Sequence, residues 1–184
     1  MRIIAGKYRS LPLEAVKGNN TRPTTDKIKE AVFNSIGPYF EGGMMLDLYA
    51  GSGSVGLECI SRGMDHVIFV DKSYDAVSTI KKNIAFVKVS NQCTVYKMDA
   101  LAAVRRLKEE GKVFDLVYLD PPYAKEQNEK VMRALCELNL LKDDAVVVVE
   151  SLKEDTFADE IGNLRKYKEA VYGITRITYY EVIV

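Results

Sequence analysis

The chain is poor in the residue types on which several classes of site depend. Its 184 residues include no tryptophan and one histidine, His66, which precedes an apolar run and is expected to be structural. A metal site built from several histidines is excluded, and a serine–histidine–aspartate triad would depend on this one residue. Cys59, Cys93 and Cys136 are far apart in the sequence and lack CxxC spacing, which favours reduced thiols in a cytoplasmic protein.

Long hydrophobic runs are also lacking. No apolar stretch approaches the roughly 18 residues that a membrane-spanning helix needs. The first ten residues turn polar too early for a signal peptide. We therefore expect a cytoplasmic protein without membrane contact. The length, with 47% hydrophobic and 28% charged residues, is typical of a single globular domain, here residues 1–184.

Charges of the two signs are equal in number but unevenly distributed. Residues 1–29 carry seven Lys and Arg residues against Glu14 and Asp26, in a chain with 26 residues of each sign. A basic arm with its linker, residues 1–22, thus precedes a mildly acidic body, residues 23–184. This distribution favours a polyanionic partner such as nucleic acid, although charged runs are more often only solvated surface.

Alternating patterns predict the secondary structure. Residues 2–15 predict a hairpin of two short strands, and apolar periodicity predicts a helix at 25–36. Further strands are predicted at 44–49, 66–70, 93–98, 114–119 and 145–149. Helices are predicted between them at 54–62, 74–87, 100–110 and 128–138. Two strand-like runs joined by Tyr172 and Gly173 close the chain. The order predicts a doubly wound α/β fold with a mostly parallel, seven-stranded sheet and an antiparallel C-terminal hairpin.

The ends of the first three predicted strands suggest a nucleoside pocket. In open α/β sheets, ligands bind beyond the carboxyl ends of the strands. Gly51, Gly53 and Gly56 have the G-x-G-x-x-G spacing there, and Asp71 and Asp99 end the next two strands. Each aspartate could instead be a helix N-cap, but together with the loop they favour an adenosine site. The candidate residues for cofactor binding are Tyr49, Ala50, Gly51, Ser52, Gly53, Asp71, Lys72, Asp99 and Ala100, together with Asp120 at the end of the fourth predicted strand.

The fourth predicted strand ends in Asp120, Pro121, Pro122 and Tyr123. Prolines cannot extend a sheet ladder, so they form a rigid rim. A planar amine is a poor nucleophile whose two hydrogens need acceptors. Asp120 and the Pro121 carbonyl could accept them, and Tyr123 could stack on the planar group. A nicotinamide enzyme has no use for this motif, whereas the structural alternative is a strand-ending turn capped by an acid.

Nearly the whole chain resembles a known family. The glycine loop, "LDPPY", "RIIAGKYRSLPL" and "TRPTTDKIKEAVFN" resemble the bacterial small-subunit ribosomal RNA methyltransferase D family. The resemblance implies a Rossmann-like enzyme that methylates the exocyclic N2 amine of a guanine in 16S ribosomal RNA. It implies S-adenosylmethionine as methyl donor, S-adenosylhomocysteine as product and no metal. It also implies that Arg22 and Thr24 border the carboxylate end of the cofactor. Cys59 departs mildly from the family, where alanine is expected.

Asp-Pro-Pro-Tyr also occurs in DNA adenine-N6 and protein glutamine-N5 methyltransferases, which remain alternatives. A nicotinamide oxidoreductase and a non-catalytic binding module are more remote ones. The chain has no room for a DNA recognition domain, which favours an RNA target presented by shape. The state of that RNA, naked, within an assembling 30S particle or in the finished subunit, is open, and we expect a monomer.

The basic arm is the predicted RNA contact, and the residues assigned to phosphates are Arg2, Lys7, Arg9, Lys17 and Arg22. On this hypothesis, deleting residues 2–14 leaves the fold nearly intact. The alternative is that the hairpin is a structural cover for the sheet edge.

Overall fold

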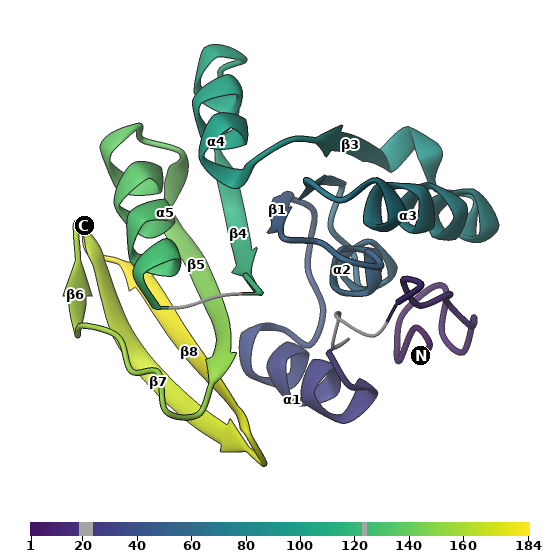
Figure 1. Ribbon diagram of the computed structural model, residues 1–184, viewed down its shortest axis with the longest axis horizontal. Coiled ribbons are helices and arrows are strands. Elements are labelled where there is room, and N and C mark those ends of the chain that lie inside the picture. The colour runs from purple at the N-terminus through teal and green to yellow at the C-terminus, as the bar shows by residue number, and fades with distance from the viewer. Residues whose placement is uncertain (19–23, 123–124) are drawn as a thin grey trace.

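The computed structural model describes residues 1–18, 24–122 and 125–184. In this part of the chain a single sheet has eight strands in the order β3-β2-β1-β4-β5-β8-β7-β6 (Figure 1). Strands β1 to β5 run parallel, whereas β6, β7 and β8 pair antiparallel. The strands are β1 (Met44–Leu48), β2 (His66–Asp71), β3 (Cys93–Lys97), β4 (Phe114–Leu119), β5 (Leu141–Leu152), β6 (Glu160–Ile161), β7 (Leu164–Tyr172) and β8 (Thr175–Val182).

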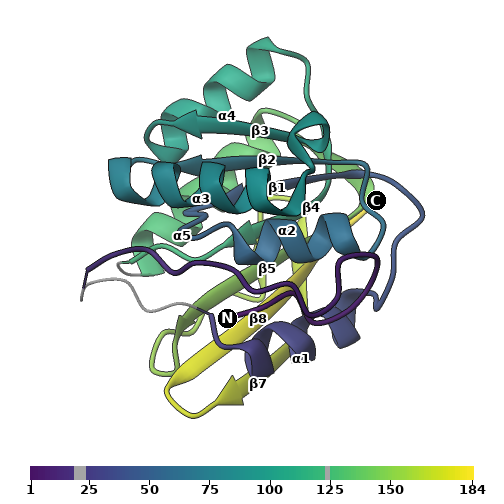
Figure 2. The same cartoon turned by 90° about the vertical axis from the view of Figure 1, so that its right-hand side faces the viewer.

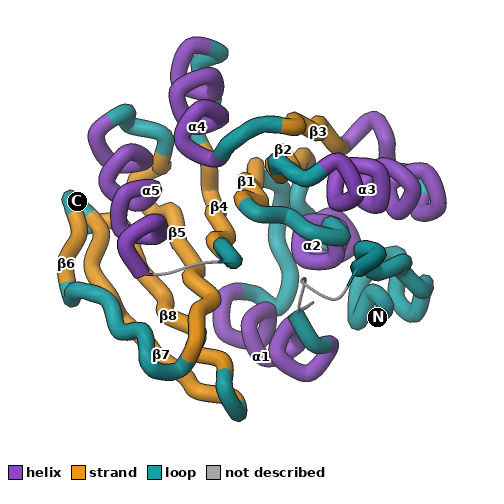
Figure 3. Tube along the Cα trace, in the orientation of Figure 1, coloured by secondary structure: helices purple, strands orange, loops and turns teal. Residues whose placement is uncertain are grey.

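Helices cover both faces of the sheet (Figures 1 and 2). The helices are α1 (Asp26–Ile36), α2 (Ser54–Ser61), α3 (Tyr74–Val87), α4 (Ala100–Glu109) and α5 (Lys125–Glu137), with a short 3₁₀ turn at Ser90–Gln92. Helices α1, α2 and α3 lie on one side of the sheet, and α4 and α5 lie on the other (Figure 3). The first three helices and the arm share one hydrophobic cluster, and α4 and α5 share the other. The central strands read as apolar runs because both of their faces are buried. None of the described helices has the length and apolar character that crossing a membrane requires.

The doubly wound α/β prediction is confirmed, but the strand count is wrong by one. The additional strand is β6, whose two residues pair with Arg165 and Leu164 of β7. Two residues are too few to show an alternating pattern, so the sequence could not reveal this strand. Strand β5 also begins at Leu141 rather than near 145, and its register against β4 is irregular between Leu141 and Val146.

The predicted N-terminal hairpin is not formed as two strands. Its two runs form one isolated bridge, between Arg2 and Pro12, with backbone hydrogen bonds around it such as the one from Ile3 to Leu11 at 3.0 Å. The backbone amides of Ile4 and Ala5 instead donate to the carboxylate of Glu58 on α2, at 2.9 and 3.1 Å. The arm therefore packs along helix α2 and not along either edge strand of the sheet, β3 or β6 (Figure 2).

The arm contributes to the hydrophobic core. Ile3 is fully buried and Leu13 is 7% exposed, and both belong to the cluster that α1 and α2 share. Removing residues 2–14 would expose that cluster, so the expectation that the fold survives their deletion is contrary to the structure. The contacts favour the alternative of a structural cover, although what it covers is helix α2.

Candidate active site

A cavity of about 580 Å³ lies at the carboxyl ends of the central strands. Its volume falls within the range of pockets that bind small molecules and cofactors. It joins two groups of residues that the sequence analysis identified separately. The first group ends β2 and begins α4, and the second follows β4: Asp71, Lys72, Asp99, Ala100, Asp120, Pro121 and Pro122. Tyr123 lies outside the described residues.

The glycine loop makes a tight turn between β1 and α2. Gly51 and Gly53 have φ angles of 59° and 83°, in the left-handed region that favours glycine. Gly56 serves a different purpose, because a Cβ atom there would lie 2.3 Å from the ring of Phe69. The first two glycines therefore shape the turn, and the third lets α2 approach β2 closely.

Asp71 is held by backbone amides at the edge of the cavity. Its Oδ2 accepts a hydrogen bond from the amide of Gly51 at 3.0 Å, and its Oδ1 accepts one from Ser73 at 2.9 Å. Ser73, not Asp71, is the N-cap of α3. The N-cap alternative is therefore wrong for Asp71, whose carboxylate links the glycine loop to the end of β2.

Asp99 does cap a helix, as the structural alternative suggested. Its Oδ2 accepts from the amides of Leu101 and Ala102 at the start of α4, at 3.1 and 3.5 Å. It also lines the large cavity. The two roles are compatible because Oδ1, the other carboxylate oxygen, has no hydrogen bond within the described residues.

A second cavity of about 70 Å³ shares Tyr49 and Asp120 with the large one. Its walls include Ala50 and Ser52 of the predicted loop. They also include Asp47 of β1, which sequence reasoning missed. An acidic residue inside an apolar strand, directly before the glycine loop, was the signal that could have identified it.

Asp47 is a buried carboxylate without a cationic partner in the described part of the chain. It is 2% exposed, and its Oδ2 accepts one hydrogen bond, from the amide of Gly56 at 3.1 Å. Burial raises the pKa of Asp47 well above its usual range, and the nearby charges of Asp71 and Glu150 raise it further. The position thus favours a neutral carboxyl group or a carboxylate that faces a positively charged ligand.

Glu150, at the end of β5, fixes one wall of the small cavity. One of its oxygens, Oε1, accepts from the hydroxyls of Thr24 and Tyr118, at 2.8 and 2.7 Å. Burial, with the charges of Glu150 and Asp120, raises the pKa of Tyr118 well above its usual range. Thr24 therefore lines the small cavity while its hydroxyl donates to Glu150. Arg22, predicted beside it, lies outside the described residues.

Asn83 of α3 ties the end of the arm to the glycine loop. Its Oδ1 accepts from the amide of Glu14 at 2.9 Å, and its Nδ2 donates to the carbonyls of Glu14 and Ser52 at 3.0 and 2.9 Å. The next arm residues, Ala15 and Val16, line the small cavity. The arm therefore contributes to the site through Ala15 and Val16, the residues at its C-terminal end.

The predicted RNA-contacting residues do not form one cluster. The amide of Lys7 donates to the carbonyl of Ser61, the last residue of α2, so Lys7 and Arg9 lie at the end of that helix opposite the glycine loop (Figure 2). Arg2 and Lys17 are closer to the cavities, because Met1 contacts Ser52 and Val16 lines the small cavity. The Arg2 side chain is 59% exposed and lies 3.8 Å from Asp26.

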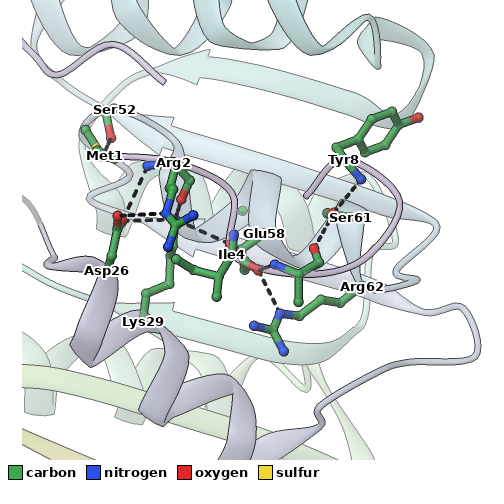
Figure 4. Close-up of polar contacts among 12 residues, drawn as sticks. Met1, Arg2, Ile4, Tyr8, Asp26, Lys29, Ser52, Glu58, Ser61 and Arg62 are labelled. Carbon is green, nitrogen blue, oxygen red and sulfur yellow. Dashed lines mark hydrogen bonds and ion pairs between the residues drawn. The ribbon is translucent and has the colours of Figure 1, made fainter. Parts of the chain in front are cut away.

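A buried ionic cluster holds the arm to α1 and α2 (Figure 4). Glu58 is completely buried, and its oxygens lie 2.8 Å from Nε of Arg62 and 3.4 Å from Nζ of Lys29. Lys29 also donates to the carbonyl of Arg2 at 2.6 Å. Burial lowers the pKa of Lys29, and the charge of Glu58 raises it. The cluster therefore joins three segments through charges that the protein itself neutralises.

Metal-binding groups and cysteine thiols form no candidate site in the described ranges. They contain no group of three or more His, Cys, Asp or Glu residues that could hold a metal ion. All three cysteines are free, and His66 contacts the hydroxyl of Thr94 at 2.8 Å between β2 and β3. The acidic cavities are therefore the principal candidate site.

Comparisons with known proteins identify the family of the chain and several of its relatives. The family described as conserved hypothetical protein 95 matches residues 1–181. The chain is 39% identical to "Putative rRNA methyltransferase YlbH" of Bacillus subtilis, with 98% of each chain covered. It is 34% identical to ribosomal RNA small subunit methyltransferase D of Haemophilus influenzae, covering 98% of this chain and 93% of that one. The solved structure "Putative methyltransferase yhhF" of Escherichia coli is 28% identical, with a TM-score of 0.85 and coverage of 100% and 98%.

Proposed function

Because the chain belongs to the conserved hypothetical protein 95 family and has relatives named ribosomal RNA small subunit methyltransferase D, we propose that it is an S-adenosylmethionine-dependent RNA methyltransferase. The methyl acceptor is the exocyclic N2 amine of a guanine in small-subunit ribosomal RNA. One observation supports this best: a single cavity connects the acidic strand ends of a nucleoside pocket to Asp120 and its two prolines.

The donor set of the cavities fits the cofactor. Asp71 is assigned to the ribose hydroxyls and Asp99 to the adenine amino group, with Lys72 and Ala100 beside them. Asp47, buried without a cation in the described residues, provides negative charge for the amino group of the cofactor. Thr24 and Arg22 are assigned to its carboxylate end. Bound S-adenosylmethionine would supply an activated methyl group on a sulfonium.

Asp120 is assigned to the target amine. A guanine amine delocalises its lone pair into the ring, and it presents two hydrogens that need acceptors. Asp120 and the Pro121 carbonyl accept them, which orients the amine and localises its lone pair. Pro122 stiffens the turn, and Tyr123 stacks on the base. Methyl transfer would leave the nitrogen positively charged with both of its hydrogens and release S-adenosylhomocysteine. That cationic amine is strongly acidic until it loses a proton, so water or Asp120 can take the proton and no further base is required.

The test is methyl transfer from radiolabelled S-adenosylmethionine to RNA, DNA and protein, followed by nucleoside mass spectrometry. Small-subunit ribosomal RNA from cells that lack this gene serves as the unmethylated substrate, and we expect N2-methylguanosine to form in it when the protein is added. Asp120→Ala should reduce turnover far more than cofactor affinity, which calorimetry measures separately. Methyladenine in DNA, methylglutamine in protein or full activity of Asp120→Ala would contradict the proposal.

A further inference from the structure

The large cavity extends beyond the residues assigned to the cofactor and the amine. Past Asp120, its walls are Ser151 and Leu152 of β5 and Thr175 of β8. Leu152 pairs with Thr175 in the sheet, and the amide of Lys153 donates to the carbonyl of Ile174 at 2.9 Å. The turn of the C-terminal hairpin therefore lies beside the mouth of the cavity.

The side chains of this turn are unusual for a surface position. Leu152 and Ile174 are 54% and 53% exposed, and each follows or precedes a residue that lines the cavity. Lys153, which follows Leu152 and whose amide donates to Ile174, is exposed. Its ammonium forms no ion pair within the described ranges. Two exposed aliphatic side chains beside an exposed cation combine an apolar surface with a positive charge.

We propose that Leu152, Lys153 and Ile174, the hairpin rim, bind the nucleotide that neighbours the target guanine. The target base itself must enter the cavity to reach Asp120, so it has left its stack and its neighbour has lost one stacking partner. Leu152 and Ile174 cover that exposed base face, and Lys153 contacts the adjoining phosphate. This inference rests on the proposed function.

RNA suits the rim better than a protein partner. The rim is continuous with the cavity in which the RNA amine is held, and Lys72, also exposed, lines the opposite part of the same cavity. Cations on both sides of the mouth match a backbone that crosses it. Two aliphatic side chains are too small an apolar area for a stable protein interface.

Two pairs of variants test the assignment, with small-subunit ribosomal RNA from cells lacking the gene as the probe. The combined Leu152→Ser and Ile174→Ser variant should raise KM for this RNA about tenfold, with kcat and cofactor affinity unchanged. Its control is Val113→Ser, because Val113 is 43% exposed and precedes β4 at the other end of the sheet. Lys153→Ala should reduce the slope of log affinity against log salt by about 0.7–0.9. Lys142→Ala, at the opposite end of β5, should leave the slope unchanged.

The outcomes separate the rim from the proposed function. If the wild-type protein methylates this RNA and both rim variants match their controls, the rim assignment is overturned and the function stands. If the wild type methylates no RNA, the proposed function and the rim fall together. A loss of binding to a protein component of the small subunit, with naked RNA bound normally, would also overturn the rim.

Discussion

Two buried carboxylates on neighbouring elements differ in what surrounds them. Glu58 on α2 is fully buried and meets two cations and two backbone amides. Asp47 on β1 is 2% exposed and accepts one amide, with no cation in the described part of the chain. The amide that Asp47 accepts belongs to Gly56, two residues before Glu58, so one short helix connects the two environments.

The difference distinguishes a charge that stabilises the fold from a charge reserved for a ligand. Breaking a buried ion pair costs several kcal/mol because the remaining charges stay buried. An unpaired buried carboxylate lowers the stability of the unliganded protein for the same reason, and binding of a cationic ligand removes that free-energy penalty. We therefore expect neutralisation at the two sites to change stability in opposite directions.

Deleting residues 2–14 should have the largest effect, because it removes the amides that Glu58 accepts and exposes the cluster around Ile3. The free energy of unfolding should fall by about 5 kcal/mol or more, which combines a lost core side chain with a disrupted buried charge. Thermal unfolding measures the change. A truncated protein with wild-type stability and cofactor affinity would show that the arm is dispensable to the fold.

Glu58→Gln should be the next largest change. It leaves Lys29 and Arg62 buried without their counter-charge and should cost about 3–5 kcal/mol of stability. Glu30→Gln, an exposed position on α1, is the matched control and should change little. Denaturant unfolding gives both values. Cofactor affinity measured well below the melting temperature should be unaffected, since Glu58 lines neither cavity.

Asp71→Ala extends the comparison to a carboxylate on the cavity wall. It should weaken cofactor binding by about 1.5–3 kcal/mol, the range for hydrogen bonds to a charged group. Asp75→Ala, an exposed acid in the first turn of α3, provides the control. Calorimetry on the folded variants decides, and wild-type affinity in Asp71→Ala would remove the ribose assignment.

Asp47→Asn should have the smallest effect on stability and the opposite sign. At neutral pH the unliganded variant should be more stable by about 1 kcal/mol, because asparagine avoids the cost of either burying the Asp47 charge or protonating its carboxylate. The raised pKa of Asp47 means that the wild type gains stability on protonation and loses it as pH rises through that pKa. The advantage of the variant should therefore shrink as pH falls toward 4.

Unfolding at several pH values measures this trend, and calorimetry should show weaker cofactor binding to Asp47→Asn. Destabilisation at neutral pH would contradict the assignment of Asp47 to a cationic part of the ligand.

The sequence was sufficient for most of the helices and strands and for predicting which strand-end residues lie together at one cavity. Helix periodicity, N-caps such as Thr25 and Ser73, and apolar strands are local signals, and the strand-end rule then places Asp71, Asp99 and Asp120 together. The glycine spacing likewise predicted the loop that the φ angles of Gly51 and Gly53 show.

What the sequence did not reveal depends on contacts between distant residues. The two runs of the arm pair locally, as in the hydrogen bond from Ile3 to Leu11, but the amides of Ile4 and Ala5 donate to Glu58, more than 50 positions away. Glu150 holds Thr24 across 126 positions. No local pattern records such pairs, so the tethered arm and the acidic wall at Asp47 and Glu150 required the structure.

The shortness of β6 also bears on self-association. At that edge of the sheet only Arg165 and Leu164 of β7 pair with β6, and the strand then has an irregular register near Lys166 and Lys168. Edge strands invite pairing with a second molecule unless bulges or charges interrupt them. The two-residue length of β6 and the irregular register of β7 thus disfavour the addition of another chain to this edge of the sheet.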